Sequence, residues 1–210
     1  MVYVAEKLRK YNLVSPISIL EIHPSKLQWK HEVKASVAEV WHDQLESEAE
    51  QKTTLIHLNP NFIANCPHLA INSTIDLSSL RRVTVKLKLL TGVYPLQTVR
   101  AKFKQTTSTT CLLCKDEEES VSHFIAQCNA LASLRSKFVA SLSNMIPMVY
   151  LHSGRLLDDQ DLLTQFVLDC THPKVLNLVP LNHEAQTNIE VITQQMVDAL
   201  HAARARHINP

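Results

Sequence analysis

The sequence predicts an all-α protein, a helical bundle. Only two of its 210 residues are glycine, whereas a β-rich fold needs many tight turns with positive φ, which glycine usually supplies. Apolar residues recur at intervals of three and four along several stretches, as they do on one face of an α-helix. Hydrophobic residues make up 45% of the chain and charged residues 20%, a composition typical of soluble globular proteins.

The first of three expected segments, residues 1–75, is a helical segment that ends in a connector. Residues 2–11 form a short helix in this prediction, and Ser15 before Pro16 is the pattern of a helix cap. A long amphipathic helix is expected from Lys26 to Lys52, because this stretch contains neither glycine nor proline. Residues 53–75 contain turn-forming Asn-Pro and Cys-Pro pairs, which indicate a connector.

The second segment, residues 76–147, is expected to contain several shorter helices. Asp76 is placed to cap a helix that ends at Gly92, where a left-handed residue terminates many helices. Its expected apolar stripe consists of Leu80, Val83, Leu87 and Leu90. Further helices are predicted at 95–104, at 120–127, where Ser120 is placed as the cap, and at 130–146. The third segment, residues 148–210, is expected to hold C-terminal helices at 158–170 and 184–207.

Charge is distributed unevenly, although the net charge is only +1. Residues 76–105 carry seven basic side chains against Asp76 alone. Such a surface can neutralise phosphates, and Tyr94 and Phe103 could stack on bases. The alternative is internal pairing with residues 32–50, which hold six acids and one lysine. The candidate phosphate contacts are Arg81, Arg82, Lys86, Lys88, Arg100, Lys102 and Lys104.

Cysteine and histidine are concentrated between residues 111 and 128, in the pattern C-x2-C-x8-H-x4-C. Three thiolates and one imidazole are the ligands of a tetrahedral structural zinc site. The predicted ligands are Cys111, Cys114, His123 and Cys128. With all four engaged, no position remains for a metal-bound water, so hydrolytic chemistry is not expected. The acids at 116–119 are expected to form a solvated loop.

The cysteine usage and the lack of a hydrophobic leader predict an intracellular protein, nuclear or cytoplasmic. Five cysteines, an odd number, with three of them in metal-ligand spacing, favour a reducing compartment. The N-terminal residues become charged at once, unlike a signal peptide. No apolar run approaches the ~20 residues of a membrane helix, so no membrane association is expected.

Two parts of the chain resemble the region that follows the polymerase domain in non-LTR retrotransposon reverse transcriptases. These are VKLKLLTGVYPLQTVRAKF at 85–103 and TCLLC followed by HFIAQC at 110–128, within a resemblance that spans about residues 7 to 140. The resemblance implies a CCHC zinc knuckle whose ligands are the three cysteines and the histidine named above. It also implies help in holding template RNA and target DNA.

The function expected from this resemblance is binding and not catalysis. The Asp-Asp motif of a polymerase between hydrophobic strands is absent from the sequence, as is any nuclease constellation. We therefore expect a zinc-stabilised module that binds RNA or DNA, with single strands favoured, and that is not an enzyme. The sequence leaves open a structural or protein-interaction module, or a decayed transposon fragment without a selected function.

Overall fold

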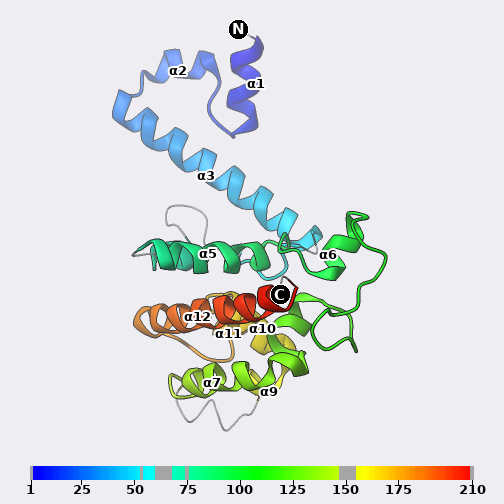
Figure 1. Ribbon diagram of the computed structural model, residues 1–210. Helices are drawn as coiled ribbons and strands as arrows, with labels where there is room; N and C mark the ends of the chain where they lie inside the picture. The colour runs from blue at the N-terminus through cyan, green and yellow to red at the C-terminus, as the bar shows by residue number, and fades with distance from the viewer. Residues whose placement is uncertain (1, 53, 60–67, 74–75, 147–154, 209–210) are drawn as a thin grey trace. The chain divides into compact units, whose positions relative to one another are not determined.

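A computed structural model describes residues 2–52, 54–59, 68–73, 76–146 and 155–208. In these ranges the regular structure is helical, apart from one isolated β-bridge, which confirms the predicted all-α class (Figure 1). No helix in the described part of the chain is both long and apolar enough to cross a membrane. The chain divides into two compact units, the first with the residues up to Lys52 and the second with residues 54–59 and 68 onward.

The first unit contains three helices, α1 (Val2–Lys10), α2 (Pro16–Ile22) and α3 (Lys26–Gln51). The side chain of Ser15 caps α2 as predicted, accepting a hydrogen bond from the Ser18 N–H. Ser25 and Gln28 form a reciprocal capping box at the start of α3. None of the side chains described in this unit is buried. Leu27, an apolar residue in the first turn of α3, is 79% exposed.

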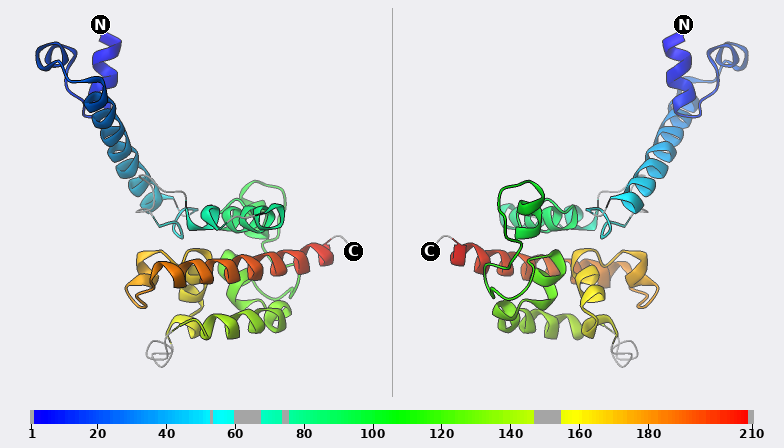
Figure 2. Two further views of the ribbon diagram at one scale, coloured as in Figure 1. Left: turned by 90° about the vertical axis from the view of Figure 1, so that its left-hand side faces the viewer. Right: turned by 90° about the vertical axis from the view of Figure 1, so that its right-hand side faces the viewer.

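The second unit holds the hydrophobic core. Figures 1 and 2 show α12 (His183–Ile208) running between α5 (Leu77–Leu90) on one side and α7 (Ala132–Ser143) on the other. Ile189, Met196, Val197 and Leu200 are fully buried along α12. The shorter elements are α4 (Leu69–Asn72), α6 (Gln97–Lys102), η2 (His123–Gln127), η3 (Asn129–Leu131), α9 (Arg155–Asp158), α10 (Gln160–Leu168) and α11 (Pro173–Leu176).

Helix α5 begins and ends as its sequence predicts. Asp76 accepts a hydrogen bond from the Ser79 N–H, and the Ser79 hydroxyl bonds back to Asp76, which completes a capping box. Gly92 has a φ of 67°, and the Val93 N–H donates to the Lys88 carbonyl, the pattern of a Schellman C-cap. The predicted apolar stripe is partly wrong, because Leu80 is 51% exposed while Lys86 is fully buried in the face toward α12.

The segment boundaries expected from the sequence do not separate compact units in the described residues. Segments 76–146 and 155–208 belong to one unit, because α12 packs against both α5 and α7. The expected boundary at 147–148 lies outside the described residues, and the connector at 53–75 is described only at 54–59 and 68–73. These contacts join helices that lie far apart in the sequence, which local periodicity cannot reveal.

Candidate metal centre

Cys111 and Cys114 lie on a tight hairpin loop between α6 and the turn η2. The loop is closed by an antiparallel bridge between Thr110 and Glu118, and the Cys111 N–H donates to the Glu117 carbonyl at 2.7 Å. Lys115 adopts a left-handed conformation with φ 61°, and its N–H donates to the Cys111 carbonyl. The hairpin therefore turns both thiols of the C-x2-C pair to the same side.

His123 and Cys128 come from the two ends of a widened helical turn, η2. The Ser120 side chain caps this turn, as predicted, by accepting from the His123 N–H at 3.0 Å. The turn is π-helical, because the Cys128 N–H donates to the His123 carbonyl five residues earlier. Turns of this kind are rare and often occur at functional sites. The sequence predicted a helix here but gave no sign of this register.

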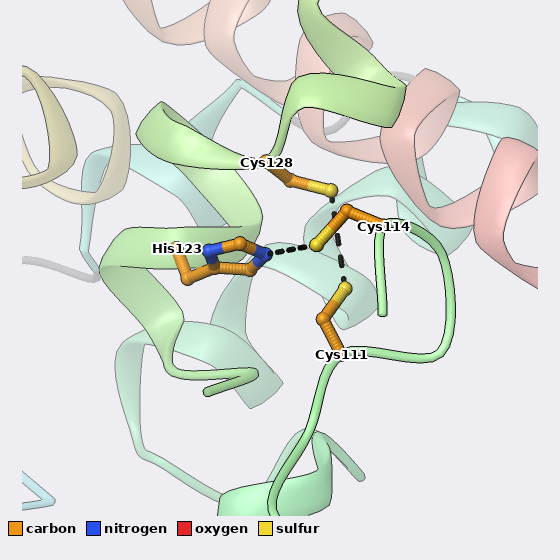
Figure 3. Close-up of side chains that lie close together, drawn as sticks. All are labelled: Cys111, Cys114, His123 and Cys128. Atoms are coloured by element: carbon orange, nitrogen blue, oxygen red, sulfur yellow. Dashed lines mark hydrogen bonds between the residues drawn. The ribbon is translucent and has the colours of Figure 1, made fainter. Parts of the chain in front are cut away.

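The four predicted ligands converge on one point (Figure 3). Their ligand atoms all lie within 4.8 Å of one another and could hold a metal ion. The Cys111 and Cys128 sulfur atoms are 3.9 Å apart, and the Cys114 sulfur is 3.4 Å from His123 Nε2. Three of the four side chains are buried and Cys114 is half-buried. The structure thus brings together the residues that their spacing had selected.

The orientation of His123 suits a ligand, and Glu117 is the residue that fixes it. His123 Nδ1 lies 2.9 Å from Glu117 Oε2, so Nδ1–H donates to the carboxylate and Nε2 keeps a lone pair toward the sulfur atoms. A carboxylate behind a ligating imidazole is a common support in metal sites. Our sequence analysis assigned Glu117 to a solvated loop and missed this contact.

The cysteines differ in acidity in the metal-free protein. Burial would raise the pKa of Cys114, but N–H groups of Asp116 and Glu117 and hydrogen bonds to Cys111 and His123 lower it to about 7. Burial and the neighbouring Cys111 raise the pKa of Cys128 to about 12. Burial also raises the pKa of Cys111. A cation among the three sulfur atoms would offset the cost of ionising these buried thiols.

Glu119 is buried, whereas residues 116–118 are exposed, so the expectation of a solvated loop is wrong at this one residue. Its carboxylate accepts two hydrogen bonds from Arg204 of α12, at 2.7 and 3.0 Å. It also accepts from the Gln97 N–H at the start of α6, and the Thr98 hydroxyl donates to its carbonyl. The residue therefore ties the hairpin loop to both α6 and α12, since bidentate pairs of this kind fix orientation.

Two further side chains position the metal-binding turn. Arg135 of α7 is buried and donates to the carbonyls of Ile125 and Cys128 at 2.7 and 2.8 Å. These bonds provide partners for carbonyls at the end of η2 that the helix itself does not use. Phe124, which follows His123 in η2, is buried and stacks on Tyr94 with ring centroids 5.6 Å apart.

The structure separates the seven candidate phosphate contacts. Lys88, Lys102 and Lys104 are exposed, while Arg82 and Arg100 are half-buried. The side chain of Arg81 is 65% exposed and lies 3.5 Å from Asp198 of α12. Lys86 is fully buried against Glu190 of α12, so its assignment as a phosphate contact is wrong. Arg81 and Lys86 thus both have acidic partners on α12.

Tyr94 is likewise unavailable for stacking on a base, because it is 3% exposed and its hydroxyl lies 2.7 Å from His201 Nδ1. Burial lowers the pKa of His201, and the charges of Arg81, Arg204 and Lys88 lower it further, against the opposing effect of Asp198. Burial and these three cations therefore outweigh Asp198 in their effect on His201. The sequence analysis did not include this histidine.

Comparison with known proteins gave no match to any family model, to any curated protein or to any solved structure.

Proposed function

We propose that this chain is a zinc-stabilised nucleic-acid-binding module related to the region that follows the polymerase domain in non-LTR retrotransposon reverse transcriptases. The observation that carries the proposal is the convergence of three sulfur atoms and one imidazole nitrogen within 4.8 Å. Three thiolates and an imidazole favour zinc. Tetrahedral zinc with Zn–S bonds of about 2.3 Å separates its sulfur ligands by about 3.8 Å, close to the 3.9 Å between Cys111 and Cys128.

The zinc centre in this proposal is a structural CCHC knuckle. Four protein ligands leave no open coordination position for a water or a substrate, so the module has no catalytic activity of its own. Zinc holds the hairpin that carries Cys111 and Cys114 against the turn that carries His123 and Cys128. It thereby fixes the loop through which Glu119 contacts the first turn of α6.

Nucleic-acid binding is supported by the six cations that remain after Lys86 is removed from the set. They are exposed or half-buried, and they lie on α5, on α6 and directly after α6. A flexible single strand can follow such a surface without base-specific contacts, with its phosphates held by the side chains. The proposed phosphate-binding side chains are Arg81, Arg82, Lys88, Arg100, Lys102 and Lys104, and the partner is RNA or DNA, with single strands favoured.

Elemental analysis of the purified chain tests the metal. We expect one zinc per chain and its loss in Cys114→Ser, because three ligands hold the ion far less well. Cys170→Ser is the matched control, since Cys170 is buried outside the centre and bonds to the Gln186 carbonyl. Stoichiometric zinc in Cys114→Ser, or equal loss in Cys170→Ser, would contradict the site.

Fluorescence anisotropy with a labelled single-stranded oligonucleotide tests the binding function. If six phosphates are neutralised, the affinity should fall about 300-fold between 50 and 200 mM salt, since each contact on a single strand contributes about 0.7 to the logarithmic slope. The double variant Lys88→Gln and Lys102→Gln should flatten this slope by about a quarter to a third. Absence of binding at 50 mM salt would refute the function.

The control for that variant is Lys137→Gln with Lys174→Gln. These lysines are also exposed but lie on α7 and α11, away from the proposed surface. They remove the same net charge, so an equal loss of affinity in both double variants would show that only total charge matters. We expect the control to bind within about twofold of wild type.

A further inference from the structure

The end of α6 presents an aromatic ring to solvent between two lysines. Phe103 is 70% exposed, while the other described aromatic side chains of the second unit are buried or half-buried. A single exposed apolar side chain is common on protein surfaces, so exposure alone assigns no role. Here the neighbours on both sides, Lys102 and Lys104, are exposed as well.

Lys104, the residue after Phe103, is held in a left-handed backbone conformation that is unfavourable for lysine. The Lys104 N–H donates to the Ala101 carbonyl at 3.0 Å and the Gln105 N–H donates to the Arg100 carbonyl at 2.9 Å, which forms a Schellman motif. Lys104 occupies its left-handed position with φ 55°. Glycine takes this position without steric cost, as Gly92 does at the end of α5. At α6 the chain instead keeps a cation beside the ring.

The other end of α6 is anchored to the metal-binding loop. Glu119 accepts from the Gln97 N–H at 2.8 Å, and the Thr98 hydroxyl donates to the Glu119 carbonyl at 2.9 Å. Glu119 is in turn paired with Arg204 inside the core. The short helix is therefore fixed at its first turn and closed at its last, and Phe103 projects from a well-supported element. Such support is what a binding group needs to keep its orientation.

We propose that Phe103 is a stacking site for an unpaired nucleobase, with Lys102 and Lys104 contacting the phosphates on either side of it. This inference rests on the proposed function and assigns its ligand class as a single-stranded segment. Every base offers a π-face, so stacking tolerates any sequence. A base inside a duplex is already stacked on its neighbours, so this site discriminates against double strands.

The test measures binding of two fluorescein-labelled probes to the whole chain, a 12-nucleotide oligothymidylate and a hairpin duplex with the same number of phosphates. Phe103→Leu keeps an apolar side chain but removes the π-face. It should weaken oligothymidylate binding about tenfold, within the range of one stacked base, and leave duplex binding within about twofold. Phe103→Trp should retain wild-type affinity for the single strand.

Tyr3→Leu is the matched control, because Tyr3 is an aromatic residue of nearly equal exposure, 69%, in the first unit. It should leave the affinity for both probes unchanged. If wild type binds oligothymidylate in a salt-dependent manner and Phe103→Leu binds it equally well, the stacking site is wrong and the proposed function stands. Equal weakening on both probes also overturns the stacking site. If wild type binds neither probe, the proposed function itself fails.

Discussion

Removing the ammonium group of Lys86 should destabilise the second unit by several kcal/mol. The side chains of Lys86 and Glu190 are 0% and 1% exposed, and Lys86 Nζ lies 2.7 Å from both Glu190 Oε2 and Thr193 Oγ1. Removing one partner of such a pair leaves the other charge buried and unpaired, at a cost of about 3–5 kcal/mol. Lys86→Met isolates this cost, because methionine retains most of the apolar stem and leaves little cavity.

Urea unfolding at pH 7, followed by circular dichroism in the presence of zinc, measures the effect. With a urea dependence of about 2 kcal/mol per molar, a loss of 4 kcal/mol, the middle of the ~3–5 range, lowers the midpoint by about 2 M. Lys88→Met is the control on the same helix, since Lys88 is exposed, and it should change the stability by less than about 0.5 kcal/mol.

The double variant Lys86→Met and Glu190→Leu should recover most of the lost stability, because replacing a buried ion pair by apolar side chains is often neutral. Equal midpoints for Lys86→Met and Lys88→Met would refute the reasoning, as would a double variant less stable than Lys86→Met. Oligonucleotide affinity should show the opposite pattern, falling in Lys88→Met and not in folded Lys86→Met.

Three other substitutions test the centre and its surroundings. Asp169→Asn should lower the free energy of unfolding by about 2 kcal/mol at pH 7. Hydrogen bonds hold the pKa of this buried carboxyl at about 2 rather than 3.8, and one pKa unit is about 1.36 kcal/mol. Because the folded-state pKa is depressed, its urea-midpoint difference from wild type should vanish as pH falls from about 4 to about 2. Glu117→Gln should weaken zinc binding about 10-fold or more in competition with a chromophoric chelator, unlike Glu118→Gln. Gly92→Ala should lower the unfolding free energy by about 1–2 kcal/mol. The φ of Gly92 is 67°, and the added Cβ would lie 2.9 Å from Thr54 Cβ. An unchanged urea midpoint would contradict this expectation.

The features that sequence could predict are those whose partners lie within a few residues. The caps at Ser15, Ser25 and Asp76 each depend on a hydrogen bond three residues along the chain. The four candidate metal ligands lie in one window of eighteen positions, so their spacing already limits how far apart they can be. The same holds for Gly92, whose left-handed conformation is determined by the end of one helix.

The features that sequence could not predict depend on partners far along the chain. In the sequence, Lys86 is one of several cations in a basic stretch. Its partner Glu190 lies 104 residues later and becomes known only from the fold. Glu119 is likewise one of several acids in an acidic run, and its partner Arg204 lies 85 residues later. Composition assigns both residues to solvent, because most lysines and glutamates are exposed. Only the packing of α12 shows that these two are buried.

The C-terminal segment is therefore central to the module, although no part of it beyond about residue 150 carried a resemblance. Glu190 and Arg204 lie on the same helix, and they hold the basic helix α5 and the metal-binding loop respectively. His201 lies between them in sequence and bonds to Tyr94, which stacks on Phe124 beside the metal centre. Helix α12 thus connects the charged surface and the metal centre through side chains. Loss of zinc should in consequence disturb α6 through Glu119 and leave the Lys86–Glu190 pair in place, since that pair has no contact with the metal-binding loop in the described structure.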